Sequence, residues 1–174
     1  MAILQILQYP NEILQSKAEP ITEFNEELES LAKNMIETMY QAQGVGLAAN
    51  QVGVLKRIVV IDVSEEQNSP MVLCNPRVVE ASSELVDHEE GCLSLKGLYE
   101  KVKRPGHVVI EAQNIKGESI DFEADGLLAV CVQHEIDHLD GTVFIDHLSR
   151  FKKDRACTKL KKLRNEDKKR QNQQ

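Results

Sequence analysis

The sequence predicts an α+β protein in which small antiparallel or mixed sheets pack around a central helix, with a further helix near each end of the chain. Three observations predict this fold. Residues 22–44 and 146–168 carry apolar side chains at helical intervals, several short β-like runs occupy the middle of the chain, and an apolar helical pattern precedes residue 141. The β-like runs outnumber the helices and do not alternate with them, which is typical of α+β folds rather than of doubly wound sheets.

The composition fits one domain of 174 residues whose core consists mainly of Leu, Ile and Val, because aromatic residues make up only 4%. No apolar run approaches the ~18 residues of a membrane span. The N-terminal stretch MAILQILQYP lacks the basic residues of a signal peptide, and Gln and Pro interrupt it. Four cysteines in such a chain indicate reduced thiols. We therefore expect a cytoplasmic protein without membrane association.

The first predicted helix lies in TEFNEELESLAKNMIETMYQAQG. Thr22 is the expected N-cap, and Gly44 ends the helix after about five turns. Apolar residues at intervals of three and four give it one face that packs on the core: Phe24, Leu28, Leu31, Met35, Met39 and Ala42. The Met residues in this set are interpreted as core filler.

Four β-like runs follow the first helix: KRIVVIDV (56–63), PMVLCNPRVVE (70–80), GHVVIEAQ (106–113) and ESIDFEA (118–124). Residues 114–117 form a turn between the last two, which predicts a hairpin. The central helix is GLLAVCVQHEIDHLDG, with its N-cap at or beside Asp125 and its end at Gly141. Because its first half is apolar nearly all round, we expect this helix to be buried.

The C-terminal segment differs in charge from the rest of the chain. Residues 150–174 contain eleven Lys and Arg against three Asp and Glu, a net charge of +8, whereas residues 1–149 carry −15. We therefore divide the chain into a main domain, 1–149, and a basic helical tail, 150–174, in which Ala156, Leu160 and Leu163 share one face. The asymmetry suggests a polyanionic partner, although composition alone favours a solvated helix that only keeps the chain soluble.

The central helix contains the pattern His-Glu-x-x-His. His134 and His138 lie ~40° apart around the helix and ~6 Å along it, so both imidazoles can bind one ion. Glu135 points in a different direction from either histidine, so it is better placed to hold a water than to bind the ion. The alternative is that both histidines only make hydrogen bonds inside the core.

Two histidines are too few for a catalytic metal site, which normally takes three protein ligands. A metzincin would have a third His at the position of Phe144, so that class is excluded. A thermolysin-like site would use a glutamate after the motif, and the only one there is Glu166, within the basic tail. Cys92 offers a thiolate, and Cys-His-His is an established set for an open site. Spacing alone does not decide for Cys92, and His88 also lies in a credible loop.

Three segments together resemble a known family. GVGLAANQVG (44–53), EGCLSL (90–95) and QHEIDHLDG (133–141) resemble the three signature motifs of peptide deformylases, in the same order and with matching separations. The opening ILQYPNEIL and the hairpin before the third motif are similar too, so the resemblance extends to about Ser149. It implies a metal-dependent hydrolase that removes the N-formyl group from the formylmethionine of nascent polypeptides and releases formate.

The resemblance also implies the roles of individual residues. The metal ligands would be Cys92, His134 and His138. Glu135 would be the general acid/base for attack by a metal-bound water, and Gln51 and the backbone N–H of Leu93 would donate hydrogen bonds to the formyl oxygen as it becomes anionic. Gly46 would belong to the edge along which the peptide lies. The walls of the methionine pocket would be Val45, Leu127, Val130 and Cys131.

The implied cofactor is one divalent metal ion per chain, Fe(II) in the cell, although a Cys-His-His set also suits Zn, Ni or Co. In bacterial members a basic C-terminal helix docks on the ribosome, which favours ribosome contact for the tail of this chain. A monomer is expected. One departure concerns the rim of the site, because many relatives have Pro where this chain has Lys96, which follows Leu95.

Two other functions remain as alternatives at this point. A zinc endopeptidase of the HExxH kind would need a third His or Glu at another spacing and a longer cleft. A non-enzymatic, ribosome-associated protein would use its metal only for structure, so loss of Glu135 would change nothing.

Overall fold

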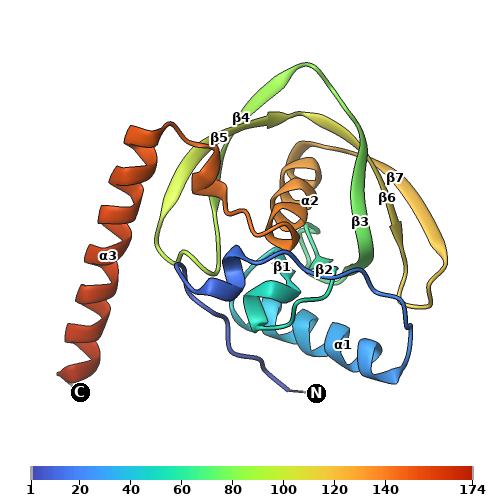
Figure 1. The fold of residues 1–174 in the computed structure, drawn as a ribbon, viewed down its shortest axis with the longest axis horizontal. Helices are drawn as coiled ribbons and strands as arrows, with labels where there is room; N and C mark the ends of the chain where they lie inside the picture. The colour runs from blue at the N-terminus through green and yellow to red at the C-terminus, as the bar shows by residue number, and fades with distance from the viewer. Residues whose placement is uncertain (1, 174) are drawn as a thin grey trace.

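The computed structural model describes residues 2–173 and confirms the α+β fold (Figure 1). Five strands form one sheet in the order β1-β2-β3-β6-β7, and two form a second sheet, β4-β5, with antiparallel pairing throughout. The strands are Gly46–Ala48 (β1), Ile58–Ile61 (β2), Met71–Ala81 (β3), Leu85–Gly91 (β4), Tyr99–Pro105 (β5), His107–Gln113 (β6) and Ser119–Asp125 (β7). The helices are Glu26–Gln41 (α1), Gly126–Leu139 (α2) and Arg150–Asn172 (α3).

Helix α1 begins later than predicted, because Asn25 rather than Thr22 is its N-cap. The Asn25 side chain accepts a hydrogen bond from the backbone N–H of Leu28 at 3.1 Å. Both residue types cap helices, so the sequence alone does not decide between them. Phe24 therefore lies before the helix, although it still packs against the core formed with α1.

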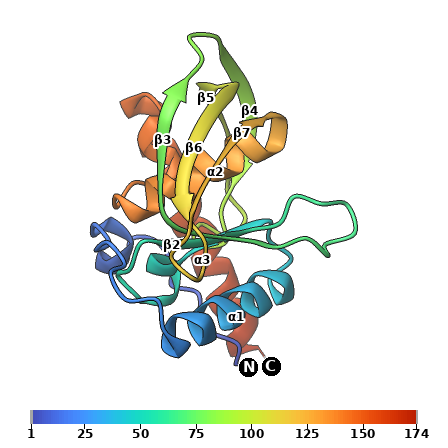
Figure 2. The same cartoon turned by 90° about the vertical axis from the view of Figure 1, so that its right-hand side faces the viewer.

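Strand β2 is buried because α1 and α2 cover its two faces. Val59 and Ile61 pack in the cluster that contains α2, whereas Ile58 and Val60 pack in the cluster that contains α1. Neighbouring residues of a strand point to opposite faces, so a strand apolar on both faces needs a cover on each side. Figure 2 shows the arrangement, with α2 above β2 and α1 below it.

Helix α2 is the buried central helix that the sequence predicts, and nine of its fourteen residues are buried. It begins directly after Asp125, whose side chain makes no capping hydrogen bond. The chain leaves the helix through Gly141, which has a φ of 80°. A Cβ at this position would lie 2.6 Å from the carbonyl oxygen of Gln15, so the turn requires glycine.

Helix α3 begins at Arg150 rather than near residue 146, because residues 144–147 form a separate 3₁₀ turn. The Ser149 hydroxyl caps it by accepting a hydrogen bond from the N–H of Lys152 at 3.3 Å. Ala156 and Leu160 are buried in a third core cluster, together with Val102 of β5 and with Phe144 and Ile145 of the 3₁₀ turn. The first half of α3 is therefore attached to the body, and the remainder extends along its edge (Figure 1). Within residues 2–173, no helix is both long and apolar enough to cross a membrane.

Candidate active site

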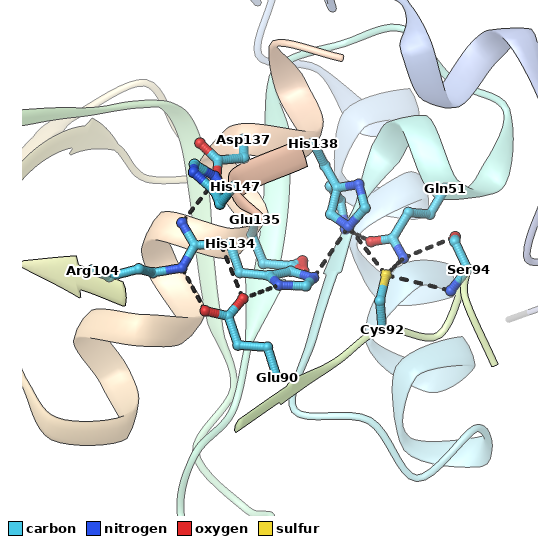
Figure 3. A network of polar contacts seen from close by, with 11 residues as sticks. Gln51, Glu90, Cys92, Ser94, Arg104, His134, Glu135, Asp137, His138 and His147 are labelled. Carbon is cyan, nitrogen blue, oxygen red and sulfur yellow. Dashed lines mark hydrogen bonds and ion pairs between the residues drawn. The ribbon is translucent and has the colours of Figure 1, made fainter. Parts of the chain in front are cut away.

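Three donor atoms from two parts of the chain meet beside α2 (Figure 3). His138 Nε2 lies 3.2 Å from His134 Nε2 and 3.3 Å from Cys92 Sγ, and one ligand atom of each residue lies within 4.8 Å of the others. Among residues 2–173, no other group of three His, Cys, Asp or Glu side chains converges in this way. A thiolate and two imidazoles are suitable ligands for a divalent transition metal, so the residues present fit such an ion.

A buried ion-pair network orients His134. Its Nδ1 donates to Glu90 Oε1 at 2.9 Å, which leaves Nε2 as the nitrogen able to bind a metal. Arg104 binds Glu90 through Nε and Nη2, at 2.6 and 2.9 Å, and reaches Asp137 Oδ2 at 2.8 Å. His147 donates to the same Asp137 oxygen at 2.8 Å. Burial opposes ionisation of Glu90, but the hydrogen bonds and charges of His134 and Arg104 outweigh it and lower the pKa of Glu90 to about 2.

Glu135 lies between the donor atoms and strand β1. Its Oε1 is 3.7 Å from His134 Nε2, and its Oε2 is buried with no hydrogen-bond partner among the described residues. Burial raises the pKa of Glu135 to about 7, which is the range for a carboxyl group that both accepts and releases a proton. A Cβ on Gly46 would lie 3.0 Å from Glu135 Cγ, so the missing side chain at position 46 leaves room for this carboxyl group.

Gln51 lies in the 3₁₀ turn after β1, and both the oxygen and the nitrogen of its side-chain amide make hydrogen bonds. Its Oε1 accepts a hydrogen bond from the N–H of Ala48 at 2.9 Å, while its Nε2 donates to Ser94 Oγ at 3.1 Å and lies 3.6 Å from Cys92 Sγ. The backbone N–H of Ser94 also donates to the Cys92 sulfur at 3.5 Å. These contacts bring Gln51 to the segment that contains Cys92 and Leu93.

One cavity of about 650 Å³ joins these groups. Ten of the eleven predicted site residues line it: Val45, Gly46, Gln51, Cys92, Leu93, Leu127, Val130, Cys131, His134 and Glu135. The eleventh, His138, is fully buried. Lys96, at the position where the sequence departs from the family's pattern, is exposed and also lines this cavity.

Glu90, Ser94 and Arg104 are among the residues of the site that were not predicted. Glu90 and Ser94 belong to the EGCLSL segment itself, so their places beside Cys92 were a signal that could have identified them. Arg104 carries no such signal, because it is one of several basic residues of β5 and meets Glu90 only in the folded chain.

The fold and the site together define a class of protein. A buried helix that brings two histidines of an HExxH pattern to a cysteine thiol, with a glutamate beside them, is typical of a metal-dependent hydrolase. The polypeptide deformylase family model matches residues 3–154 of the chain. The chain belongs to the peptide deformylase family.

Individual relatives agree with this assignment. Peptide deformylases from Neisseria gonorrhoeae and Cellvibrio japonicus are 51% and 48% identical to the chain over 162 residues, which cover 93% of the chain and 96% of each relative. A crystal structure of a peptide deformylase from Legionella pneumophila is 42% identical, with a TM-score of 0.91, and the match covers 95% of this chain and 98% of that one. The chain is therefore an enzyme of a metalloenzyme family whose members remove the N-formyl group from nascent peptides.

Proposed function

We propose that this enzyme removes the formyl group from the N-terminal formylmethionine of nascent polypeptides, and that Cys92, His134 and His138 hold one divalent ion for the reaction. The observation that carries the proposal is the convergence of ten of the eleven predicted residues on one cavity. The ligand set suits Fe(II), Zn, Ni or Co, and we propose Fe(II) in the cell. We also propose that the enzyme works in the cytoplasm, where it would meet nascent chains.

The chemistry divides between the ion and the side chains of the cavity. When bound, the ion would polarise the formyl carbonyl and would lower the pKa of a coordinated water to around 7. Glu135 accepts a proton from the attacking water and later delivers it to the methionine nitrogen as the C–N bond breaks. The amide of Gln51 and the N–H of Leu93 donate hydrogen bonds to the formyl oxygen as it becomes negative, at ~3 kcal/mol each.

Substrate binding uses the edge of the larger sheet. Strand β1 pairs with β2 only, so its other edge offers backbone N–H and C=O groups to an extended peptide at Gly46. The methionine side chain enters a pocket with four predicted wall residues: Val45, Leu127, Val130 and Cys131. Val45 and Leu127 are 39% and 43% exposed, so an apolar side chain placed there would cover apolar surface that faces water in the free enzyme.

The test of this function is turnover of a formyl-Met peptide by enzyme purified without oxygen, with metal content measured on the same sample. Formate release should rise in proportion to bound Fe(II), stop after chelation and return when the metal is restored. The same peptide without its formyl group is the control, because its cleavage would indicate an endopeptidase. A fully metallated sample that releases no formate would overturn the proposed function.

We also propose that α3 binds the ribosome through its lysines. Support comes from the +8 charge of residues 150–174 and from four lysines of the outer half of α3 that are exposed: Lys161, Lys162, Lys168 and Lys169. Substitution of these four by Gln keeps the buried contacts of Ala156 and Leu160. We expect weaker co-sedimentation with ribosomes and a shallower salt dependence, because fewer phosphates are neutralised, and unchanged turnover of short peptides.

The matched control removes four exposed lysines from the body: Lys17, Lys33, Lys101 and Lys116. This variant has the same net charge as the α3 variant and should retain ribosome binding. An equal loss of co-sedimentation in both variants would contradict a specific role for α3. Deletion of residues 150–174 is a less direct test, because it would expose the apolar surface that α3 covers.

A further inference from the structure

The N-terminal segment of the chain connects the two turns that carry the proposed oxyanion donors. The backbone N–H of Leu7 donates to the carbonyl oxygen of Gln51 at 2.7 Å, and that of Tyr9 donates to the carbonyl oxygen of Ser94 at 2.8 Å. The Gln51 turn and the turn that follows Cys92 belong to no common sheet. Their relative position therefore depends on such contacts between them.

The residue between these two backbone bonds makes the third contact with its side chain. The Nε2 group of Gln8 donates to the carbonyl oxygen of Leu93 at 2.8 Å. Gln8 also lines the active-site cavity, although it is neither in the three motifs nor among the predicted site residues. Of the three hydrogen bonds that residues 7–9 donate to these two turns, only this one comes from a side chain and can be removed by a side-chain substitution.

The contact acts on the residue whose N–H is a proposed donor. The N–H and carbonyl of one residue are separated by two dihedral angles, so a hydrogen bond that fixes the Leu93 carbonyl restricts the orientation of its N–H. The Leu93 side chain packs on Gly44 so closely that a Cβ at position 44 would lie 2.6 Å from its Cδ1. Oxyanion donors act by being positioned in advance, and small misplacements lower the rate.

We propose that Gln8 is a positioning residue for this reaction. By binding the Leu93 carbonyl, its amide holds the Leu93 N–H toward the place where the formyl oxygen becomes negative. The inference rests on the function proposed above, and in particular on the role of Leu93. Because the Leu93 N–H acts mainly in the transition state, loss of the contact should lower kcat and leave KM nearly unchanged.

The experiment compares Gln8→Leu with Gln15→Leu. Gln15 is a matched control, since it is also exposed and also donates to one backbone carbonyl, that of Pro10 at 3.2 Å, but it does not line the cavity. Gln8→Leu should lower kcat about tenfold, with KM within about twofold of wild type and an unchanged metal content. Gln15→Leu should leave kcat unchanged. Thermal midpoints of the two variants should agree within about 2 °C.

Two further variants separate the donor from the shape of the side chain. Gln8→Glu keeps the size but places a carboxylate against the Leu93 carbonyl, so its kcat should fall at least as far as that of Gln8→Leu. Gln8→Lys keeps a donor, and its kcat should exceed that of Gln8→Leu by at least about threefold.

Several outcomes would overturn the inference. They are equal kcat values for Gln8→Leu and Gln15→Leu, a kcat loss that merely follows metal loss, and a change confined to KM. The wild-type enzyme in the same assay separates this result from the proposed function. No formate from metallated wild type would overturn both, whereas active wild type with an equally active Gln8→Leu variant would overturn only the role of Gln8.

Discussion

Replacement of Glu135 by alanine should lower formate release from a formyl-Met peptide by about a thousandfold while the enzyme keeps its metal. General acid–base groups typically contribute ~10²–10⁴-fold. Glu135 lines the cavity and lies beside the donor atoms, 3.7 Å from His134 Nε2. The other carboxylate of α2, Asp137, is held by Arg104 and His147 and does not line the cavity. No second carboxylate on this helix can therefore replace Glu135 in moving a proton.

Formate release and metal content should be measured on the same samples, because only their comparison identifies the role. Glu135→Gln keeps the size of the side chain and should be as inactive as Glu135→Ala. Glu123→Ala is the control, since Glu123 is an exposed carboxylate of β7 with a side chain 74% exposed, and it should keep full activity. Turnover above a tenth of wild type in Glu135→Gln would show that another group transfers the proton. Metal loss in parallel with activity would instead make Glu135 a ligand.

Replacement of Arg104 by methionine should lower the free energy of unfolding by about 3–5 kcal/mol, because a buried charge left without its partner is costly. Arg104 and Glu90 have side chains only 5% and 3% exposed, and Arg104 also binds Asp137. The loss corresponds to a thermal midpoint lower by roughly 6–20 °C for a chain of this size. Glu90 would also hold His134 less firmly, so metal affinity should fall by about 10–100-fold.

The matched control is Arg77→Met. Arg77 pairs with Glu111 on the sheet surface, where the two side chains are 71% and 47% exposed, and such pairs contribute about 0–1 kcal/mol. Urea unfolding curves of the two variants measure the difference, and chelator competition measures the metal affinity. Equal unfolding free energies for Arg104→Met and Arg77→Met would contradict a structural role for the buried network.

The sequence predicts the parts of this fold whose apolar residues repeat at a helical or strand interval. The central helix, its end at Gly141 and the β6–β7 hairpin are confirmed on that basis. The β4-β5 sheet was not predicted. Its inward side contains Glu90 and Arg104, a buried ion pair, so the strands do not show the alternation of apolar and polar residues that identifies a half-buried strand.

The site was predictable only in part for a related reason. The His134 and His138 spacing follows from helix geometry, but a candidate ligand 42 positions before His134 cannot be found from spacing. The thiolate chemistry of Cys92 made it one candidate, and only the resemblance to a family decided for it. The contacts of Arg104 and Gln8 are fixed by how distant segments pack. Arg104 belongs to no motif, and the similar opening segment ILQYPNEIL, which includes Gln8, indicates no role for that residue.

The donor atoms of the proposed metal site come from two separately packed parts of the molecule. Cys92 packs with the cluster that contains β5 and α3, whereas α2, which carries both histidines, packs on the larger sheet. Three donors are thus within reach of one ion only after these parts have associated. Metal binding is then linked to the native state, and its free energy stabilises that state against both the unfolded chain and any partly folded form in which only one part has formed.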